Sequence, residues 1–588
     1  MYKAPIRDIL HALNNVAGLK SALDKGLLGD ISADLAEAVL EEAGRFAGEE
    51  IAPLRMIGDT SGAVLREGKV TTPPGWKELY RKWIDGGWNS LAGPQSHGGQ
   101  GLPMMLSIAA LEMWNSGSMG FAVGPTLTMG AVEALAKHGS EELKDAYLEK
   151  LVSGEWMGTM NLTEPQAGSD LSALKARAEP AGAGAYRIFG QKIFITYGEH
   201  DFTDNIVHLV LARLPDAPAG TRGISLFLVP KFLLNADGSL GARNDAFCQS
   251  LEHKLGIHGS PTCVMIYGDG KFGSEPGAIG FLVGEENRGL ACMFTMMNNA
   301  RLAIAIQGVA VAEAAFQKAR AFASERRQGR APGETGPAMS PILAHPDVQR
   351  MLLTMQALTH AARAICYACA HALDMAHATQ GGETQFWQER ANLLTPLAKA
   401  FATDIGVEAS SLGVQVHGGM GFIEETGAAV LLRDSRIAPI YEGTNGIQAI
   451  DLVTRKLGTA DGHLTGLFAE MSAAASAYAA SPSASPLAAS QLVQSLEGLE
   501  ETTAYMHRAL AGGRMADALA GATPYLRQFA LTYAAAKLAA GLIEADARQT
   551  AIFRFFAENL LAETGALQDR VLNGAASLQA ASAILADH

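Results

Sequence analysis

Cysteine is scarce in this sequence. Five cysteines occur among 588 residues, too few for the disulfide framework that stabilises secreted proteins, so a reducing compartment such as the cytoplasm is expected. Cys366 and Cys369 form a CxxC pair, but the sequence has no second pair with metal-ligand spacing, and the surrounding ARAICYACAHAL has the composition of an apolar helix. We therefore expect two buried small side chains there and no metal site.

Positive charge and long apolar runs are also lacking. Lys and Arg together number 46 against 60 Asp and Glu, which gives a formal net charge of −14, and no Lys/Arg run appears. Nucleic-acid binding depends on clustered basic side chains, so no nucleic-acid partner and no basic membrane-surface helix are expected. No uninterrupted apolar run reaches spanning length, and MYKAPIRDIL does not resemble a signal peptide. These absences predict a soluble, intracellular protein without membrane insertion.

What is present indicates several packed domains. Hydrophobic residues make up 48% and charged residues 18% of the chain, enough for large buried cores. Helical spacing begins after Ser32, a candidate N-cap, and we expect that helix to end at Pro53. KIFIT, NIVHLVLAR and GISLFLVP are short β-type segments, whereas helical spacing returns at Ala291. After Lys456, GTADGHL and SPSASPLAAS have loop or weak-helix composition before further helices.

The order of these segments predicts an α+β multidomain protein. We expect an N-terminal α-helical domain over residues 1–157, a β-domain of barrel or sandwich type over 158–282, a C-terminal four-helix bundle over 283–458 and an additional helical domain over 459–588. Because strands and helices are segregated, a dinucleotide-binding Rossmann unit is not expected. No helix follows the glycine-rich GAGAYRIFG, so we interpret it as a turn.

Two segments of the β-domain have ligand-binding character. Residues 160–170, MNLTEPQAGSD, form a loop whose hydroxyl and amide groups suit flavin carbonyls or phosphate oxygens. Residues 192–198, KIFITYG, place Phe194 beside Thr196, so that an aromatic ring and a hydroxyl can meet a flat heterocycle. Taken alone, the first segment is better interpreted as an ordinary turn and the second as a half-buried strand.

Two further segments lie in the second helical region. In QVHGGMGF, residues 415–422, paired glycines let the backbone approach a ligand closely. In IYEGTNGIQ, residues 440–448, Glu442 stands in a glycine-rich connection between helices, which makes it a candidate base. A loop glutamate taken alone is usually solvated and inert.

The four segments occur together and in one order, and LLRDSRIAP precedes the last of them. This combination resembles the acyl-CoA dehydrogenase family over roughly residues 30–456. The resemblance implies an FAD-dependent oxidoreductase that converts an acyl-CoA thioester to the trans-2-enoyl-CoA, as in fatty acid β-oxidation. The N-terminal extension and the additional C-terminal domain are similar to a subgroup acting on 3-methylmercaptopropionyl-CoA or on longer fatty acyl-CoA thioesters.

The resemblance also implies which residues contact FAD. Phe194 and Thr196 would flank the flavin ring, although the family usually has Trp where this sequence has Phe194. Arg326 and Gln328 match positions that reach the pyrophosphate across a subunit interface, where the family often has Arg-Lys-Thr-Phe. Such shared contacts imply a homo-oligomer, with a dimer favoured over a tetramer. The implied FAD contacts are Met160, Leu162, Thr163, Gly168, Ser169, Phe194, Thr196, Arg326, Gln328, Gln415, Gly418, Gly419, Thr444 and Gly446, the last standing where some members have Gln.

Glu442 matches the catalytic base of the branch that carries Tyr-Glu-Gly-Thr. The implied substrate contacts are Ser169, Asn298, Arg301, Tyr441 and Gly443. Asn298 and Arg301 fall where many members have an Asp-x-x-Arg pair, and by themselves they equally fit a polar interruption and a helix-surface charge. The α-C–H of a thioester is too weakly acidic for a carboxylate in water. The reaction therefore needs a polarised thioester oxygen and a base whose basicity rises on desolvation.

Two other functions remain as alternatives. An acyl-CoA oxidase performs the same first half-reaction but passes electrons to O₂, whereas a dehydrogenase passes them to electron-transfer flavoprotein. A DNA-binding flavoprotein of the alkylation-response type shares the architecture but is expected to have a basic surface, which the charge of −14 disfavours.

Overall fold

The computed structural model describes residues 2–459 and 461–586, except for the side chains of residues 294–298, 459, 461, 543–544 and 586. Asn298, an expected substrate contact, therefore lies outside the described side chains. The chain forms two compact units. We call Phe46–Pro103 with Gly117–Ala300 the sheet unit, and Met1–Arg45, Met104–Ser116 and Arg301–His588 the helical unit. These units divide the expected N-terminal helical domain between them.

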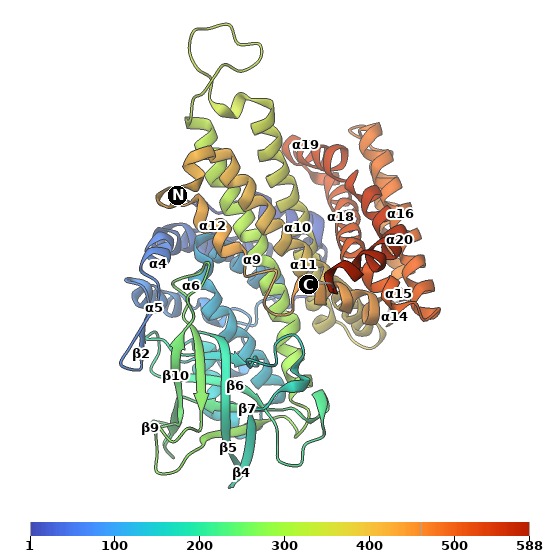
Figure 1. Ribbon diagram of the computed structural model, residues 1–588. Helices are drawn as coiled ribbons and strands as arrows, with labels where there is room; N and C mark the ends of the chain where they lie inside the picture. The colour runs from blue at the N-terminus through green and yellow to red at the C-terminus, as the bar shows by residue number, and fades with distance from the viewer. Residues whose placement is uncertain (1, 460, 587–588) are drawn as a thin grey trace. The chain divides into compact units, whose positions relative to one another are not determined.

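The sheet unit is built around an eight-stranded sheet of order β10-β11-β5-β12-β7-β6-β3, with β4 paired to β5 (Figure 1). Its neighbours are antiparallel except for β3 and β6. Its strands are β3 (Met157–Asn161), β4 (Arg177–Gly182), β5 (Ala185–Thr196), β6 (Ile206–Ala212), β7 (Ser225–Pro230), β10 (Ala246–Leu251), β11 (Thr262–Tyr267) and β12 (Ala278–Val283). Two small hairpins pair β1 (Val64–Arg66) with β2 (Lys69–Thr71) and β8 (Phe232–Leu234) with β9 (Leu240–Arg243).

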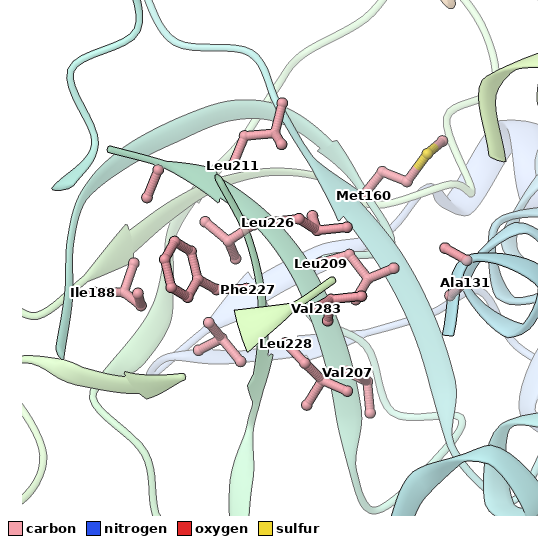
Figure 2. Packing of buried hydrophobic residues seen from close by; sticks show 14 of the residues in the cluster. Ala131, Met160, Ile188, Val207, Leu209, Leu211, Leu226, Phe227, Leu228 and Val283 are labelled. Atoms are coloured by element: carbon pink, nitrogen blue, oxygen red, sulfur yellow. The ribbon is translucent and has the colours of Figure 1, made fainter. Parts of the chain in front are cut away.

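The core of the sheet unit lies between this sheet and helix α6. Every residue of β6 and β7 is buried, as expected for strands covered on both faces. Leu209, Leu226 and Phe227 pack together with Ala131 of α6 in one apolar cluster (Figure 2). The helices of this unit are α4 (Arg55–Ser61), α5 (Trp76–Asp85), the second part of α6 (Met104–His138), α7 (Glu141–Leu143), α8 (Glu149–Ser153) and the first part of α9 (Gly289–Glu325).

Two helices are apolar and long. Segments Met104–His138 and Asn299–Glu325 reach a mean hydropathy of 1.2, although the sequence predicted no segment of spanning length. Their most apolar windows are 72% and 89% buried in the protein, which is typical of core helices. α6 is also kinked at Ser118, whose backbone is extended.

The helical unit contains the second part of α9, α10 (Pro346–Ala378) and α11 (Gly382–His417), with α10 and α11 packed together. α12 (Ala428–Ser435), α13 (Asn445–Asp451) and α14 (Leu457–Thr459) follow. The N-terminal helices are α1 (Ile6–His11), α2 (Leu19–Asp24) and α3 (Ala33–Phe46). Asp8 of α1 contacts Arg548 and Gln549, so the N-terminal extension is tied to the C-terminal helices.

The C-terminal helices form a group around α18 (Figure 1). They are α15 (Asp461–Ala479), α16 (Pro486–Ala511), α17 (Met515–Ala520), α18 (Ala522–Ala540), α19 (Ala547–Phe555) and α20 (Glu563–Ser582). α18 packs against α15, α16 and α20, and also against α10, α11 and α13. The additional helical domain predicted from the sequence is therefore a packed helical layer.

Most sequence-based segments are confirmed, and one is wrong in detail. Ser32 caps α3, since its Oγ accepts the N–H of Leu35 at 3.1 Å. Pro53 does not end the helical path, because it occupies the start of a 3₁₀ turn, where its missing N–H costs nothing, and α4 follows. GTADGHL, expected to be loop or weak helix, is helical in its described residues, since α14 ends at Thr459 and α15 begins at Asp461. Cys366 and Cys369 are buried free thiols of α10, as expected.

Candidate active site

The loop that follows β3 is anchored to the sheet unit by main-chain bonds. Glu164 and Ala167 form an antiparallel bridge in which each N–H donates to the other carbonyl at 3.0 Å. The N–H of Ile193, on β5, donates to the carbonyl of Thr163 at 2.9 Å. Strand β5 therefore holds residues 162–167 beside the end of β3. Leu162 and Thr163 stay half-exposed and Ser169 is exposed, which leaves them accessible to a ligand.

A buried ion pair supports the same loop from behind. The ammonium of Lys192, which has no exposed surface, donates to the carbonyl of Leu162 at 2.9 Å and to Glu164 at 2.8 Å. Glu164 also accepts the N–H groups of Lys175 at 2.7 Å and Ala176 at 3.0 Å. Burial lowers the pKa of Lys192 to about 8, although Glu164 opposes that shift. Burial also opposes ionisation of Glu164, but Lys192 and the two N–H groups hold its pKa below the usual range.

Phe194 is displayed on the surface of the sheet unit. Its side chain is 58% exposed and its φ is +61°, a left-handed value that costs a non-glycine residue about 1–2 kcal/mol. Thr196, two residues along β5, is half-exposed, and its carbonyl accepts the hydroxyl of Thr159 at 2.7 Å. An exposed aromatic ring on strained backbone, beside a hydroxyl, is a surface prepared for a flat ligand.

Met160 and Gly168 were also expected to contact FAD, and the structure gives these two contacts less support. The side chain of Met160 is buried in the core of the sheet unit, so only its main chain is available to a ligand (Figure 2). Gly168 is exposed, and a Cβ at this position would meet nothing within 4 Å. Nothing in the structure requires glycine at position 168.

Five further predicted FAD contacts form an exposed group at one end of the helical unit. Phe322 of α9 stacks on His417 of α11 with ring centroids 4.5 Å apart, which brings the ends of these two helices together. The exposed residues here are Arg326, Gln328, Gln415, Gly418 and Gly419, and Arg326 donates to Gln328 at 3.4 Å. Gly418 has φ +59° and opens a 3₁₀ turn that ends at Phe422. The structure thus brings together two segments that the sequence separates by almost ninety residues.

Glu442 lies in a tight connection between α12 and α13. Its φ is +54°, and that of Gly443 is +86°. A Cβ at Gly443 would lie 2.7 Å from Nε2 of Gln448, so this position requires glycine for both conformation and space. Thr444 caps α13 by accepting the N–H of Ile447 at 3.2 Å, and Gly446 is exposed in its first turn. The turn that carries the Glu442 carboxyl group is therefore built on strained backbone.

The electrostatic environment of Glu442 suits a base. The carboxyl group is half-buried, and burial raises its pKa above the usual value, whereas Arg301 and then Lys399 oppose the rise. Arg301 is 6% exposed and lies 3.9 Å from Asp451. Because its charge acts on Glu442, Arg301 belongs to the surroundings of that carboxyl group, and its expected substrate contact stays a prediction. Desolvation by a bound ligand strengthens such a base further.

Three residues around the Glu442 turn, Gln307, Lys399 and Gln448, were given no role from the sequence. Gln307 of α9 accepts the hydroxyl of Tyr441, which was expected at the substrate. Lys399 donates from α11 to the carbonyl of Gly443, and its sequence context, LAKAFA, gives no sign of that role. Gln448 is fully buried, and neither atom of its amide has a partner within the described part of the chain. Unpaired buried amide atoms beside Gly443 indicate that water or a ligand completes this site. Among the described residues, no group of His, Cys, Asp or Glu could hold a metal ion.

Comparisons with known proteins show the family of this chain. Family models match as acyl-CoA dehydrogenase N-terminal domain over residues 34–155, middle domain over 159–269 and C-terminal domain over 287–457, and as acetyl-CoA dehydrogenase C-terminal like over 467–582. The chain is 51% identical over 474 residues to 3-methylmercaptopropionyl-CoA dehydrogenase of Ruegeria pomeroyi, covering 80% of this chain and 79% of that protein. It is 31% identical over 488 residues to a broad-specificity linear acyl-CoA dehydrogenase of Mycobacterium tuberculosis, covering 80% and 78%.

A solved structure shows the same fold. The acyl-CoA dehydrogenase of Bacillus anthracis complexed with FAD matches with a TM-score of 0.74 at 21% identity, covering 93% of this chain and 89% of that one. The helical, β and helical domains with an additional C-terminal helical domain are those predicted from the sequence. This chain belongs to the acyl-CoA dehydrogenase family, the FAD-dependent oxidoreductases that act on acyl-CoA thioesters.

Proposed function

We propose that Glu442 is the base that removes the α-proton of the acyl-CoA thioester. The observation that carries the proposal is a half-buried carboxyl group on strained backbone, with a raised pKa and two cations acting on it. A carboxylate in water is too weak a base for this proton, and burial is the physical means by which a protein strengthens it.

Other residues of the chain would bind the flavin ring and support the turn with Glu442. Phe194, Thr196 and the main chain of residues 162–163 would hold the flavin ring, because they are the accessible aromatic, hydroxyl and amide groups of the sheet unit. When bound, FAD accepts the β-hydrogen of the substrate as hydride. Glu442 would take the α-proton on a carboxylate oxygen, and Tyr441, anchored to Gln307, would help to close the turn around it.

The proposed acyl group is 3-methylmercaptopropionyl, with a fatty acyl group as the alternative. The support is the 51% identity to a 3-methylmercaptopropionyl-CoA dehydrogenase, which extends over 80% of this chain. A panel of acyl-CoA thioesters that includes this compound, assayed by bleaching of the bound flavin, tests the assignment. A higher kcat/KM for butyryl-CoA or a longer fatty acyl-CoA would overturn it.

We also propose a homodimer in the cytoplasm that passes electrons to electron-transfer flavoprotein. The exposed group at the end of α9 and α11 continues into Met420, Phe422 and Ile423, which are 50%, 86% and 46% exposed. Such apolar side chains beside predicted FAD contacts fit a surface covered by a second copy. Analytical ultracentrifugation tests the dimer against a monomer or tetramer. Comparing electron-transfer flavoprotein reduction with O₂ consumption separates a dehydrogenase from an oxidase.

The Glu442→Gln variant tests the base directly. It keeps the size of the side chain and removes its basicity, so we expect the purified variant to retain yellow FAD. Flavin reduction by substrate should be slowed by about 10²–10⁴-fold. Glu37→Gln, on the exposed face of α3, serves as the control with unchanged reduction. Near wild-type bleaching in the FAD-bound Glu442→Gln protein would refute the assignment.

A further inference from the structure

Lys399 is a buried cation directly behind the turn that carries Glu442. Its side chain has no exposed surface. Its ammonium donates to the carbonyl of Gly443 at 2.7 Å and to Oδ1 of Asn445 at 3.0 Å. Burying an ammonium group costs several kcal/mol unless it is paired, so its presence in a core needs a physical reason.

Both acceptors belong to the turn itself. The Gly443 carbonyl follows Glu442 by one residue, and Asn445 begins α13. Asn445 is in turn bound to α11, where its amide donates to Asp404 at 2.7 Å, to Thr403 at 3.0 Å and to the carbonyl of Ala400 at 3.1 Å. The turn is thus joined to α11 through a polar network in which Lys399 makes the bond closest to Glu442.

The conformation of this turn needs stabilising contacts from residues outside the turn. Glu442 and Gly443 have consecutive positive φ angles, and a left-handed non-glycine residue costs about 1–2 kcal/mol. Strained backbone persists only where the surroundings over-determine it. A charge-assisted hydrogen bond to the Gly443 carbonyl is stronger than a neutral one and offsets that strain.

We propose that Lys399 is a positioning residue for catalysis: its ammonium fixes the Gly443 carbonyl, which holds Glu442 in its reactive orientation, and its charge helps to keep the carboxylate ionised. The inference rests on the proposed role of Glu442 as the base. It adds a residue of α11 that has no need to touch the substrate.

The charges around the site support this role. Burial lowers the pKa of Lys399 to about 7, while Glu442 and then Asp404 oppose the shift. On Glu442 itself, Lys399 is the second cation after Arg301 that opposes the rise in pKa.

The other titratable and charged groups facing this cluster are known. They are Tyr441 on the same turn, Asp404 and Glu408 on α11, Asp434 on α12, Asp451 on α13, Arg455 after it and Arg527 on α18. Neither of the two cations among them replaces an ammonium lost from position 399, because Arg455 acts on Arg301 and Arg527 acts on Asp404. Removing Lys399 therefore raises the pKa of Glu442 further, because it takes away one of the two cations that oppose the rise.

The Lys399→Met variant tests the inference in the FAD-bound enzyme. Methionine has similar length but neither charge nor donor. We expect FAD content to be kept, the limiting rate constant of flavin reduction to fall by about tenfold or more, and the apparent substrate dissociation constant to change little. We also expect the pH profile of flavin reduction to move to higher pH. A merely structural lysine would lower stability without moving that profile.

Lys537→Met is the matched control. Lys537 lies on α18, burial also lowers its pKa, to about 8, and the charges acting on it are Arg390 and Glu470. This variant should lose stability but keep the wild-type pH profile. If Lys399→Met does not accumulate as folded protein, Asn445→Ser removes one acceptor of Lys399 and should slow flavin reduction in the same direction.

The outcomes separate this inference from the proposed base. An active Glu442→Gln enzyme would refute both. An inactive Glu442→Gln enzyme, together with a Lys399→Met enzyme that keeps the wild-type rate constant and pH profile, would refute only the role of Lys399. In the fallback variant, an unchanged rate of flavin reduction would do the same.

Discussion

Breaking the buried ion pair between Lys192 and Glu164 should weaken FAD binding without replacing any residue predicted to contact FAD. Both side chains are almost fully buried, at 0% and 3% exposure, and their charged atoms are 2.8 Å apart. Removing one partner of such a pair costs about 3–5 kcal/mol, because the other charge stays buried alone. In Lys192→Met, Glu164 would keep the N–H groups of Lys175 and Ala176, so the lower end, about 3 kcal/mol, is expected.

That free energy acts on the loop at residues 162–167. The loop also loses the bond from Lys192 to the Leu162 carbonyl, so its binding-competent conformation becomes less populated. Since about 1.4 kcal/mol is a factor of ten, a loss of about 3 kcal/mol predicts FAD affinity reduced by about 100-fold. Flavin fluorescence titration of the apoprotein measures this change.

Two further variants make the measurement decisive. The double variant Lys192→Met with Glu164→Gln removes both charges and should bind FAD more tightly than Lys192→Met alone. Lys150→Met breaks an exposed pair with Glu155 in the same unit, worth at most about 1 kcal/mol, and should leave FAD affinity unchanged. FAD binding by Lys192→Met within threefold of wild type would refute the reasoning.

Two other predictions concern the groups nearest the chemistry. Arg301 is the larger of the two opposing charges on Glu442, so Arg301→Met should raise the pKa of that carboxyl further. Because the base must be ionised to accept a proton, the rise of flavin reduction with pH should move to higher pH in stopped-flow measurements, and an unmoved profile would contradict this. Phe194→Ala should weaken FAD binding by about 3–10-fold, from the loss of about 0.5–1.5 kcal/mol of aromatic contact. Phe194→Trp should bind FAD at least as tightly as wild type, because the ring is 58% exposed and has space to grow, and weaker binding would contradict the predicted contact.

The sequence could predict those site residues whose chemistry is evident from their neighbours in the chain. A glutamate between aromatic and glycine residues, or an aromatic beside a threonine on a strand, is visible within a few positions. The structure adds that Phe194 and Glu442 share a left-handed backbone, which is unusual for both residue types. The strain could not be predicted, because no propensity favours it and only the surrounding fold imposes it.

The supporting lysines could not be predicted for a different reason. Lys192 and Lys399 appear in the sequence as single charges in a strand and a helix, where a solvated position is the usual outcome. Their acceptors, Leu162 and Gly443, lie 30 and 44 residues away. Hydrogen bonds over such separations depend on tertiary packing, which hydrophobic periodicity does not encode.

The additional C-terminal helices bury a second side of α11. This packing affects how rigidly the turn with Glu442 is held. Arg527 of α18 binds Glu408 of α11 and Glu563 of α20, so an ion-pair network joins the three helices. A cavity of about 390 Å³ lies beside this network, and its lining includes both Asp404 and Asn445. Asn445 therefore faces the cavity and also accepts from Lys399. Because bonds in such a network depend on one another, packing of α18 against α11 limits the movement of Asn445 and, through it, of the turn that carries the base.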